Sequence, residues 1–231
     1  MKIVTIIPAR GGSKSIPRKN IRKINNKPLI AYSIEYSLRC PLVNRTIVST
    51  DDYTIARLAK RYGAEVPFIR PKRIAMDTTP DFPVLRHAIR WLKKNENYKP
   101  DILITLHPTS PLRPPRLIER AVDLLKKHPR ADSVRSVALC SQHPYRMWKI
   151  NSVYMRPALR VKNQFNLVRQ RLPLIYFQSG DIEAIRYNTI IKLNSITGKN
   201  VLPLVINSAD MFDIDSMADL RRARKAAGQR R

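Results

Sequence analysis

Cysteine and long apolar runs are both scarce in this chain of 231 residues. Its two cysteines, Cys40 and Cys140, are too few for a disulfide framework and too isolated for a zinc site. Such cysteine usage is typical of proteins from a reducing cytosol. No apolar run approaches the roughly 18 residues of a membrane-spanning helix, and no signal-peptide cleavage region precedes the first predicted strand. We therefore expect a cytoplasmic protein without a membrane partner.

Acidic residues are also scarce, because 17 Asp and Glu stand against 44 Lys and Arg and leave a net charge of +27. An excess of this size favours an anionic partner, such as nucleic acid, anionic lipid or a phosphorylated metabolite. The cations are spread through every segment, and no RNP, KH or helix-turn-helix pattern accompanies them. We expect no specific nucleic acid as a partner, and a basic nucleic-acid-binding protein on the same fold stays open as an alternative.

Short β-branched runs alternate with longer helical patterns, and 43% of the residues are hydrophobic, enough for a sizeable core. Because parallel strands need crossover connections, this alternation predicts an α/β fold with a mostly parallel sheet, in a single domain over residues 1–231. Strands are predicted at residues 2–7, 45–50, 64–69, 101–107, 181–187 and 201–206. Helices are predicted at residues 28–38, 54–61, 82–94 and 216–227. Ser216 and Asp219 occupy the capping positions of the last helix.

The pattern changes between about residues 142 and 178. Aromatic and basic residues fall there on short segments such as "HPYRMWKI" and "FNLVRQRLP", without a long amphipathic helix. We interpret this stretch as an insertion lobe or a dimerisation arm.

Three polar clusters, "ARGGSK", "STDD" and "HPTSPLR", follow predicted strands, at the sheet edge where ligands bind in such folds. In the first cluster, Gly11 and Gly12 permit a tight turn whose N–H groups can converge on phosphate oxygens. Arg10, Lys14 and Lys19 add positive charge. The spacing matches neither the Walker nor the dinucleotide-binding pattern, and a solvated basic loop is the alternative interpretation.

The stretch "PARGGSKSIPRKN" resembles the signature of the sialic acid-type cytidylyltransferases, the CMP-N-acylneuraminate synthetase family. Further motifs of that family are resembled, in the same order, by "VSTDD", "RPKRIAMDTTPDFPVLRHA", "HPTSPLR", "VRQRLP" and "DIDSMADL". The resemblance implies a Rossmann-like nucleotidyltransferase that uses Mg²⁺. Such an enzyme transfers CMP from CTP to the anomeric hydroxyl of a 2-keto-3-deoxy acidic sugar of the nonulosonic type and releases pyrophosphate. It also implies a homodimer.

The resemblance and the chemistry of the individual residues together assign residues to four roles. The catalytic residues are Arg10, Lys19 and Arg169. The nucleotide-binding residues are Gly11, Gly12, Ser13, Lys14, Asn20, Arg70, Thr79 and Asp81. The sugar-binding residues are His107, Thr109, Ser110 and Arg171. The metal ligands are Asp213 and Asp215.

Some of these residues have a second interpretation. Thr109 and Ser110 either offer hydroxyl groups to a substrate or cap a plain strand-to-helix connection. On a strand, Asp213 and Asp215 share one face about 6 to 7 Å apart, which suits Mg²⁺, and they equally suit a turn before a helix. His107 stands where the family usually has glutamine, and it is either a ligand-contacting imidazole or a locally bonded residue at a strand end. Arg171 replaces an aspartate of the family motif and is either a sugar ligand or surface charge. No general base is evident.

Two departures from the family motifs leave the sugar open, because they fall on the sugar side: Arg171, and "QSGDIE" where many sialate enzymes have N-G-A-I-Y. Activation of another 2-keto-3-deoxy acid, such as Kdo, is therefore an alternative. The "GGSK" loop argues against the Kdo enzymes, whose first loop usually has a different pattern.

Overall fold

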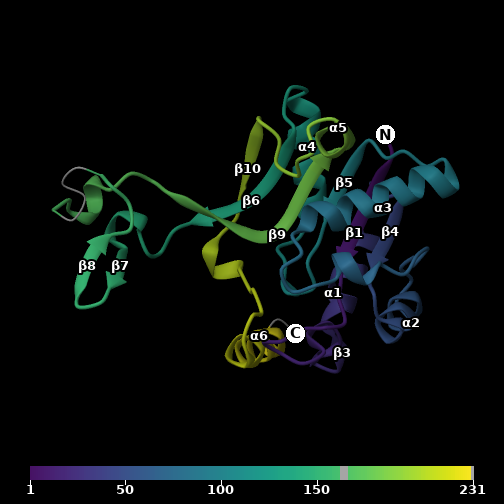
Figure 1. Ribbon diagram of the computed structural model, residues 1–231, viewed down its shortest axis with the longest axis horizontal. Coiled ribbons are helices and arrows are strands. Elements are labelled where there is room, and N and C mark those ends of the chain that lie inside the picture. The colour runs from purple at the N-terminus through teal and green to yellow at the C-terminus, as the bar shows by residue number, and fades with distance from the viewer. Residues whose placement is uncertain (162–165, 230–231) are drawn as a thin grey trace.

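A six-stranded mixed sheet organises the chain in the computed structural model, which describes residues 1–161 and 166–229 (Figure 1). The strand order is β10-β6-β9-β5-β1-β4. The strands are β1 (Ile3–Pro8), β4 (Arg45–Ser49), β5 (Ile102–Thr105), β6 (Ser133–Leu139), β9 (Tyr176–Arg186) and β10 (Val201–Val205). Only β9 runs antiparallel to its neighbours in this sheet, while the remaining pairs are parallel. The predicted α/β class with a mostly parallel sheet is confirmed.

Helices cover both faces of the sheet because its strands are apolar on both sides. In β1, Ile3 and Ile7 join the core on one face, whereas Val4 and Ile6 join the core on the other. The first face is covered by α1 (Leu29–Leu38), α2 (Tyr53–Arg61) and α4 (Leu117–Lys127). The second face is covered by α3 (Asp81–Glu96) and α5 (Tyr187–Ile191).

The strand predicted at residues 64–69 is wrong. That segment makes only an isolated bridge between Glu65 and Ile47, outside the named strands. Pro67 lacks the N–H group that would continue the ladder, which explains why the pairing stops after one bridge. The predicted set also lacks α4, α5 and β6, together with the short strands of the two hairpins described below.

The C-terminal helix α6 (Met217–Gln229) packs away from the sheet, beside the small hairpin of β2 (Lys23–Ile24) and β3 (Lys27–Pro28). Its apolar side joins a third core with Ile16 and Ile24. The Ser216 N–H donates to Asp219 Oδ2 at 2.8 Å, and the Asp219 N–H donates to Ser216 Oγ at 3.2 Å. This reciprocal capping was predicted from the sequence.

The segment between β6 and β9 projects from the body (Figure 1). It carries the hairpin of β7 (Trp148–Asn151) and β8 (Tyr154–Pro157), whose strand residues are all exposed. Residues 162–165 of the predicted insertion lie outside the described part of the chain. We call the projecting residues 142–161 and 166–175 the arm. Among the described residues, no helix is long and apolar enough to cross a membrane.

Candidate active site

A cavity of about 250 Å³ opens beyond the carboxyl ends of β1 and β5, and we call it the β1/β5 cavity. From β1 the chain crosses to β4 on one side and later returns to β5 on the other, so the cavity lies at the topological switch point where ligands bind in such sheets. Nine of the predicted site residues line it: Arg10, Ser13, Lys19, Asn20, Arg70, Thr79, Asp81, His107 and Thr109. The folded chain therefore brings together residues from three separate motifs.

The loop after β1 passes so close to the loop after β4 that its first glycine has no room for a side chain. A Cβ atom on Gly11 would lie 2.8 Å from Asp52 Cβ, and the Gly11 N–H donates to Asp51 Oδ1 at 3.0 Å. From the other side, Asn20 Nδ2 donates to the Arg10 carbonyl at 2.8 Å. These contacts fix the loop in place beside the cavity, and Asn20 acts in them as a clamp on the backbone.

The cations of this loop are paired with carboxylates of the same chain. Arg10 forms an ion pair with Asp77, and Lys14 Nζ lies 2.9 Å from the same carboxylate. The hydrogen bond from Lys14 and the charge of Arg10 lower the pKa of Asp77. Lys19 Nζ donates to Asp215 Oδ1 at 3.0 Å and to the carbonyl of Ile214 at 2.9 Å. Asp77 was not among the predicted site residues, although it lies within a quoted motif.

Arg70 supplies a buried positive charge to the cavity wall. Its side chain donates to the Ser49 carbonyl at 2.7 Å, and burial lowers its pKa. Because the guanidinium stays charged at any physiological pH, it is a fixed cation that is only partly neutralised by nearby carboxylates. A phosphate group is the ligand that such a cation favours.

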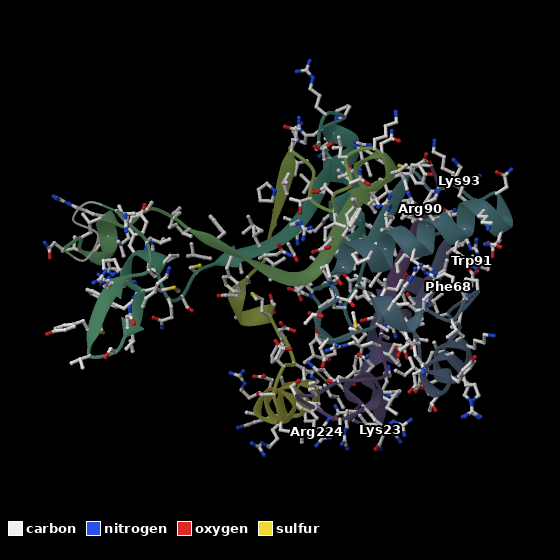
Figure 2. All side chains as sticks on the ribbon, viewed as in Figure 1. Lys23, Phe68, Arg90, Trp91, Lys93 and Arg224 are labelled. Carbon is white, nitrogen blue, oxygen red and sulfur yellow. The ribbon has the colours of Figure 1, made fainter. Side chains whose placement is uncertain are left out.

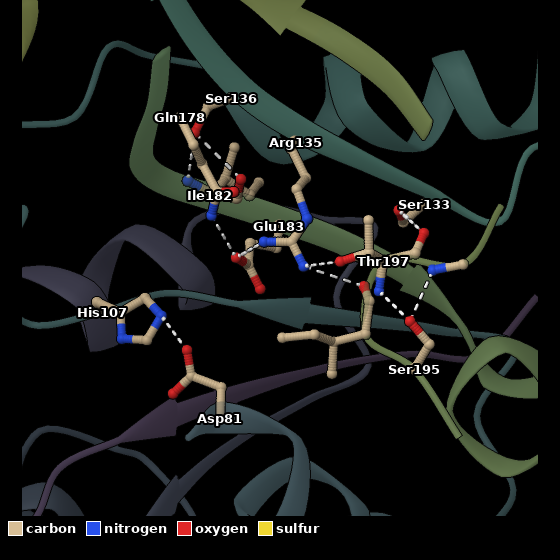
Figure 3. A network of polar contacts seen from close by, with 12 residues as sticks. Asp81, His107, Ser133, Arg135, Ser136, Gln178, Ile182, Glu183, Ser195 and Thr197 are labelled. Atoms are coloured by element: carbon tan, nitrogen blue, oxygen red, sulfur yellow. Dashed lines mark hydrogen bonds and ion pairs between the residues drawn. The ribbon is translucent and has the colours of Figure 1, made fainter. Parts of the chain in front are cut away.

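His107 and Asp81 both line the cavity and form a pair, with Nε2 3.4 Å from Oδ2 (Figure 3). Burial lowers the pKa of His107, but the hydrogen bond and charge of Asp81 outweigh it, so the net shift is upward. Burial raises the pKa of Asp81, but the hydrogen bond and charge of His107 outweigh it, so the net shift is downward. Each partner therefore favours the charged form of the other.

Arg113, the last residue of "HPTSPLR", is a structural residue that the sequence analysis missed. It is 7% exposed and donates to the carbonyl of Asp181 at 2.6 Å, to Ser33 Oγ at 2.9 Å and to the carbonyl of His107. Burial lowers its pKa to about 10. Its bond to the His107 carbonyl holds the backbone of the loop after β5 in place. Its place in the motif was the only available signal.

Two buried carboxylates from β9 lie behind this loop. Glu183 pairs with Arg135 of β6 and accepts from Gln178 Nε2 at 3.0 Å (Figure 3). Burial raises the pKa of Glu183 and of Asp181. Among the described residues, Glu183 Oε2 and Asp181 Oδ2 have no hydrogen-bond partner. The "QSGDIE" stretch thus places unsatisfied acceptor oxygens behind the loop that carries His107.

Asp213 and Asp215 fit a divalent cation that draws further ligands from a substrate. Burial raises the pKa of Asp213 and the charge of Asp215 raises it further, while a hydrogen bond from Thr109 lowers it. Two carboxylates that repel each other in this way are stabilised by a cation. Within residues 1–161 and 166–229, no cluster of three or more His, Cys, Asp or Glu side chains could hold a metal. Phosphate oxygens and water would therefore have to complete the coordination.

The remaining predicted residues lie outside the cavity lining. Gly12 has open space around it, Lys14 reaches the cavity through Asp77, and Ser110 is buried at 2% exposure. Arg169 and Arg171 are exposed on the arm, and the fold of one chain does not bring them to the β1/β5 cavity.

The sheet order, the switch-point cavity and its converging cations together define an α/β protein of the nucleotide-binding class. A search of protein families matches residues 4–197 to the model described as Cytidylyltransferase. The chain belongs to this cytidylyltransferase family, and it is an enzyme of the nucleotidyltransferase type. The resemblance noted in the sequence is confirmed.

Relatives and solved structures agree with this family. The chain is 34% identical to the CMP-N,N'-diacetyllegionaminic acid synthase of Legionella pneumophila, over 95% of this chain and 93% of that protein. It is 32% identical to the post-translational flagellin modification protein B of Campylobacter coli, over 95% and 92% of the two chains. The structure of CMP:2-keto-3-deoxy-manno-octonic acid synthetase complexed with CTP matches all of both chains with a TM-score of 0.76 at 19% identity, which shows a shared fold.

Proposed function

We propose that this enzyme transfers CMP from CTP to the anomeric hydroxyl of a nonulosonic acid and releases pyrophosphate, in the cytoplasm. The observation that carries the proposal is the convergence of Arg10, Lys19 and Arg70 on one cavity at the switch point of a cytidylyltransferase fold. Full-length similarity to a legionaminic acid synthase favours a nonulosonic acceptor over Kdo, because the likeness to the Kdo enzyme extends to the fold alone.

The reaction forms one bond and breaks one bond at the α-phosphorus of CTP. The anomeric oxygen attacks this phosphorus, the bond to the bridging oxygen of the β-phosphate breaks, pyrophosphate leaves and the hydroxyl proton is released. Arg10 and Lys19 exchange their carboxylate partners for phosphate oxygens and offset the developing charge. Thr109, which lines the cavity beside His107, supplies a hydroxyl group toward the sugar, whereas the buried Ser110 would act through the position of the loop. Positioning and charge stabilisation are therefore the main contributions of the protein.

Mg²⁺ is the cofactor we propose for Asp213 and Asp215. When bound, it would neutralise triphosphate charge and orient the departing pyrophosphate. The two aspartates lie next to Lys19, which contacts Asp215 directly, so metal and cation would act on the same phosphates. Because the protein offers few ligands, the proposal requires that metal and CTP bind together.

The active form we propose is a homodimer joined through the arm. Its hairpin exposes several large apolar side chains, with exposed fractions of 78% for Ile150, 85% for Val153 and 77% for Tyr154. A two-stranded hairpin of this kind is only marginally stable unless it packs against something. A second copy of the chain would cover these residues and could bring Arg169 to the cavity of its partner.

A substrate panel tests the proposed function. The purified protein is incubated with Mg²⁺, each of the four ribonucleoside triphosphates, and legionaminic, pseudaminic, N-acetylneuraminic or Kdo acid, while pyrophosphate release is measured. We expect release with CTP and a nonulosonic acid. Preference for Kdo would favour the alternative acceptor. Absence of release with CTP and every acid, from protein that melts cooperatively, would contradict the proposal.

A further inference from the structure

A second cavity, of about 550 Å³, lies beside α3 and shares no lining residue with the β1/β5 cavity. We call it the α3 groove. One wall is the outer side of α3, and the other is the turn at Lys72–Ile74. Its volume is within the range of pockets that bind small molecules and cofactors. Neither the sequence motifs nor the proposed reaction assigns it a role.

The lining of the α3 groove is positively charged and contains no acidic side chain. Arg86, Arg90 and Lys94 follow one another at intervals of four residues, so they form a row along one side of the helix. Arg73 faces them from the opposite wall. None of these four cations forms a salt bridge with a carboxylate of the described residues. This contrasts with the β1/β5 cavity, where the chain pairs its own cations, and leaves the groove complementary to an anion.

Aromatic side chains provide the apolar part of the wall. Phe82 and Trp91 both line the groove, and the guanidinium of Arg86 lies over the Phe82 ring at 5.5 Å. Trp91 packs against Phe68, with 5.4 Å between the ring centroids, and it remains partly accessible. Both residues are labelled in Figure 2. A rigid aromatic surface beside a row of cations suits a ligand that has both a flat ring and a chain of negative charges.

Two residues that line the groove each have a buried nitrogen atom without a partner. Arg86 Nε and His87 Nδ1 are both buried without a hydrogen bond to any described residue. Burial and the neighbouring Arg70 and Arg73 lower the pKa of His87, so its imidazole is neutral at neutral pH. Because both atoms are closed off by the surrounding chain, a ligand in the groove would contact the exposed side chains of Arg73 and Arg90 rather than these two nitrogens.

We propose that the α3 groove is a second nucleotide site, which binds a nucleoside triphosphate with its base against Trp91 and its phosphates along Arg73, Arg86 and Arg90. The cation row from Arg86 to Lys94 extends for about 12 Å, since a helix rises 1.5 Å per residue. This length suits one nucleotide rather than an extended polymer, and the groove ends at Asn95. This proposal does not depend on the identity of the acceptor sugar, because nucleotide binding in the α3 groove is measured without the transfer reaction.

Trp91 provides a direct signal for binding, because the only other tryptophan of the chain is Trp148 on the arm. ATP is titrated into a Trp148→Phe protein while the fluorescence of Trp91 is recorded. We expect saturable quenching. In the same background, Arg86→Glu together with Arg90→Glu should weaken the apparent affinity by roughly tenfold or more. Arg73→Glu, on the opposite wall, should also weaken the apparent affinity for ATP. This variant replaces the double variant if the double variant does not fold.

The matched control is Arg57→Glu together with Arg61→Glu, two exposed arginines at the same spacing on α2. This pair changes the net charge equally and should leave the quenching unchanged. A second background with Lys19→Ala reports on the β1/β5 cavity, and the ATP signal should persist there. Loss of the signal in that background, equal weakening by the α2 pair, or tighter groove-dependent binding of oligo(dT) than of ATP would overturn the proposal.

Discussion

At the scale of single residues, two cations that line the β1/β5 cavity are paired with carboxylates of the same chain. Asp77 and Asp215 neutralise Arg10 and Lys19, and both carboxylates remain at least 30% exposed in their side chains. An incoming triphosphate would therefore compete with protein carboxylates that are already partly hydrated. Replacing a carboxylate by a phosphate leaves each cation with an anionic partner. This exchange therefore costs less free energy than leaving a buried cation unpaired.

Lys19→Ala is expected to lower kcat/KM for CTP by roughly 10²-fold or more, the loss typical of removing one preorganised charge-stabilising donor. Its side chain is only 11% exposed and bonds to the segment before α6, so some loss of thermal stability should accompany the kinetic effect. Initial rates at saturating sugar give the comparison. Lys14→Ala is the control, because its side chain is 88% exposed and a smaller loss is expected. Near-normal turnover by Lys19→Ala would remove it from the catalytic residues.

His107→Gln is expected to destabilise the protein in a pH-dependent way. Because the pKa of His107 is raised, its stabilising charge is complete below the unfolded value of 6.5 and is lost as pH rises through the higher folded value. The lowered pKa of Asp81 contributes above its unfolded value of 3.8 and is lost as pH falls through the folded value. The Tm deficit of His107→Gln should therefore be largest at about pH 5 to 6 and smaller at about pH 9. Scanning calorimetry across this range, with His128→Gln as the exposed control, measures it. An equal deficit at both ends would contradict the charged pair.

At the scale of elements, the turn between β10 and α6 combines two tasks within a few residues. Ser216 and Asp219 cap the helix, whereas Asp213 and Asp215 face Thr109 and Lys19. The N–H of Ile214 donates to the Thr109 carbonyl at 2.9 Å, and this bond holds the turn against the loop after β5. Capping and proposed metal binding can therefore be separated by substitution.

Asp215→Asn should abolish most turnover at ordinary Mg²⁺ and regain part of it at high Mg²⁺ or with Mn²⁺, because it removes one of two anionic ligands. Ser216→Ala should instead lower stability by about 1 kcal/mol and leave the Mg²⁺ dependence unchanged. Titrating Mg²⁺ at fixed CTP for both variants makes the comparison. If Asp215→Asn and Asp213→Asn both work normally at low Mg²⁺, the metal binds elsewhere. Their double variant should be non-additive, since both act through one ion.

At the scale of the whole molecule, the body and the arm differ in how they are stabilised. The body buries continuous cores on both faces of its sheet, whereas the exposed hairpin of the arm has no comparable core of its own. In the proposed homodimer the partner would cover the exposed apolar residues of the arm, and Arg169 lies on the same segment.

Mixed dimers give a direct test of the proposed assembly. A chain with Lys19→Ala and a chain with Arg169→Ala are each expected to be nearly inactive. When they are coexpressed with different tags, a heterodimer should contain one intact site, so a random mixture should recover about a quarter of normal activity. Ile150→Asp should lower both the dimer fraction in sedimentation experiments and the recovery. A dimer without any recovery would show that Arg169 does not act in its partner's cavity.

The amino-acid sequence by itself determined the alternating elements, the loops at the strand ends and the family. These features depend on local periodicity and on neighbouring residues, as in the capping box of Ser216 and Asp219, which the structure shows as predicted. The predicted strand at residues 64–69 failed because a strand is completed by its neighbour, and Pro67 interrupts that pairing.

Only the tertiary structure decided which side chains meet. The insertion of β9 between β5 and β6, antiparallel to both, places Glu183 against Arg135 and the Asp181 carbonyl against Arg113. The pairing of Arg10 with Asp77 joins residues 67 positions apart in the chain, and the α3 groove forms only when Arg73 folds opposite the row on α3. Such contacts depend on packing between segments that are distant in the chain. Composition and periodicity do not specify them, because many arrangements of the same strands and helices satisfy one local pattern of apolar and polar residues.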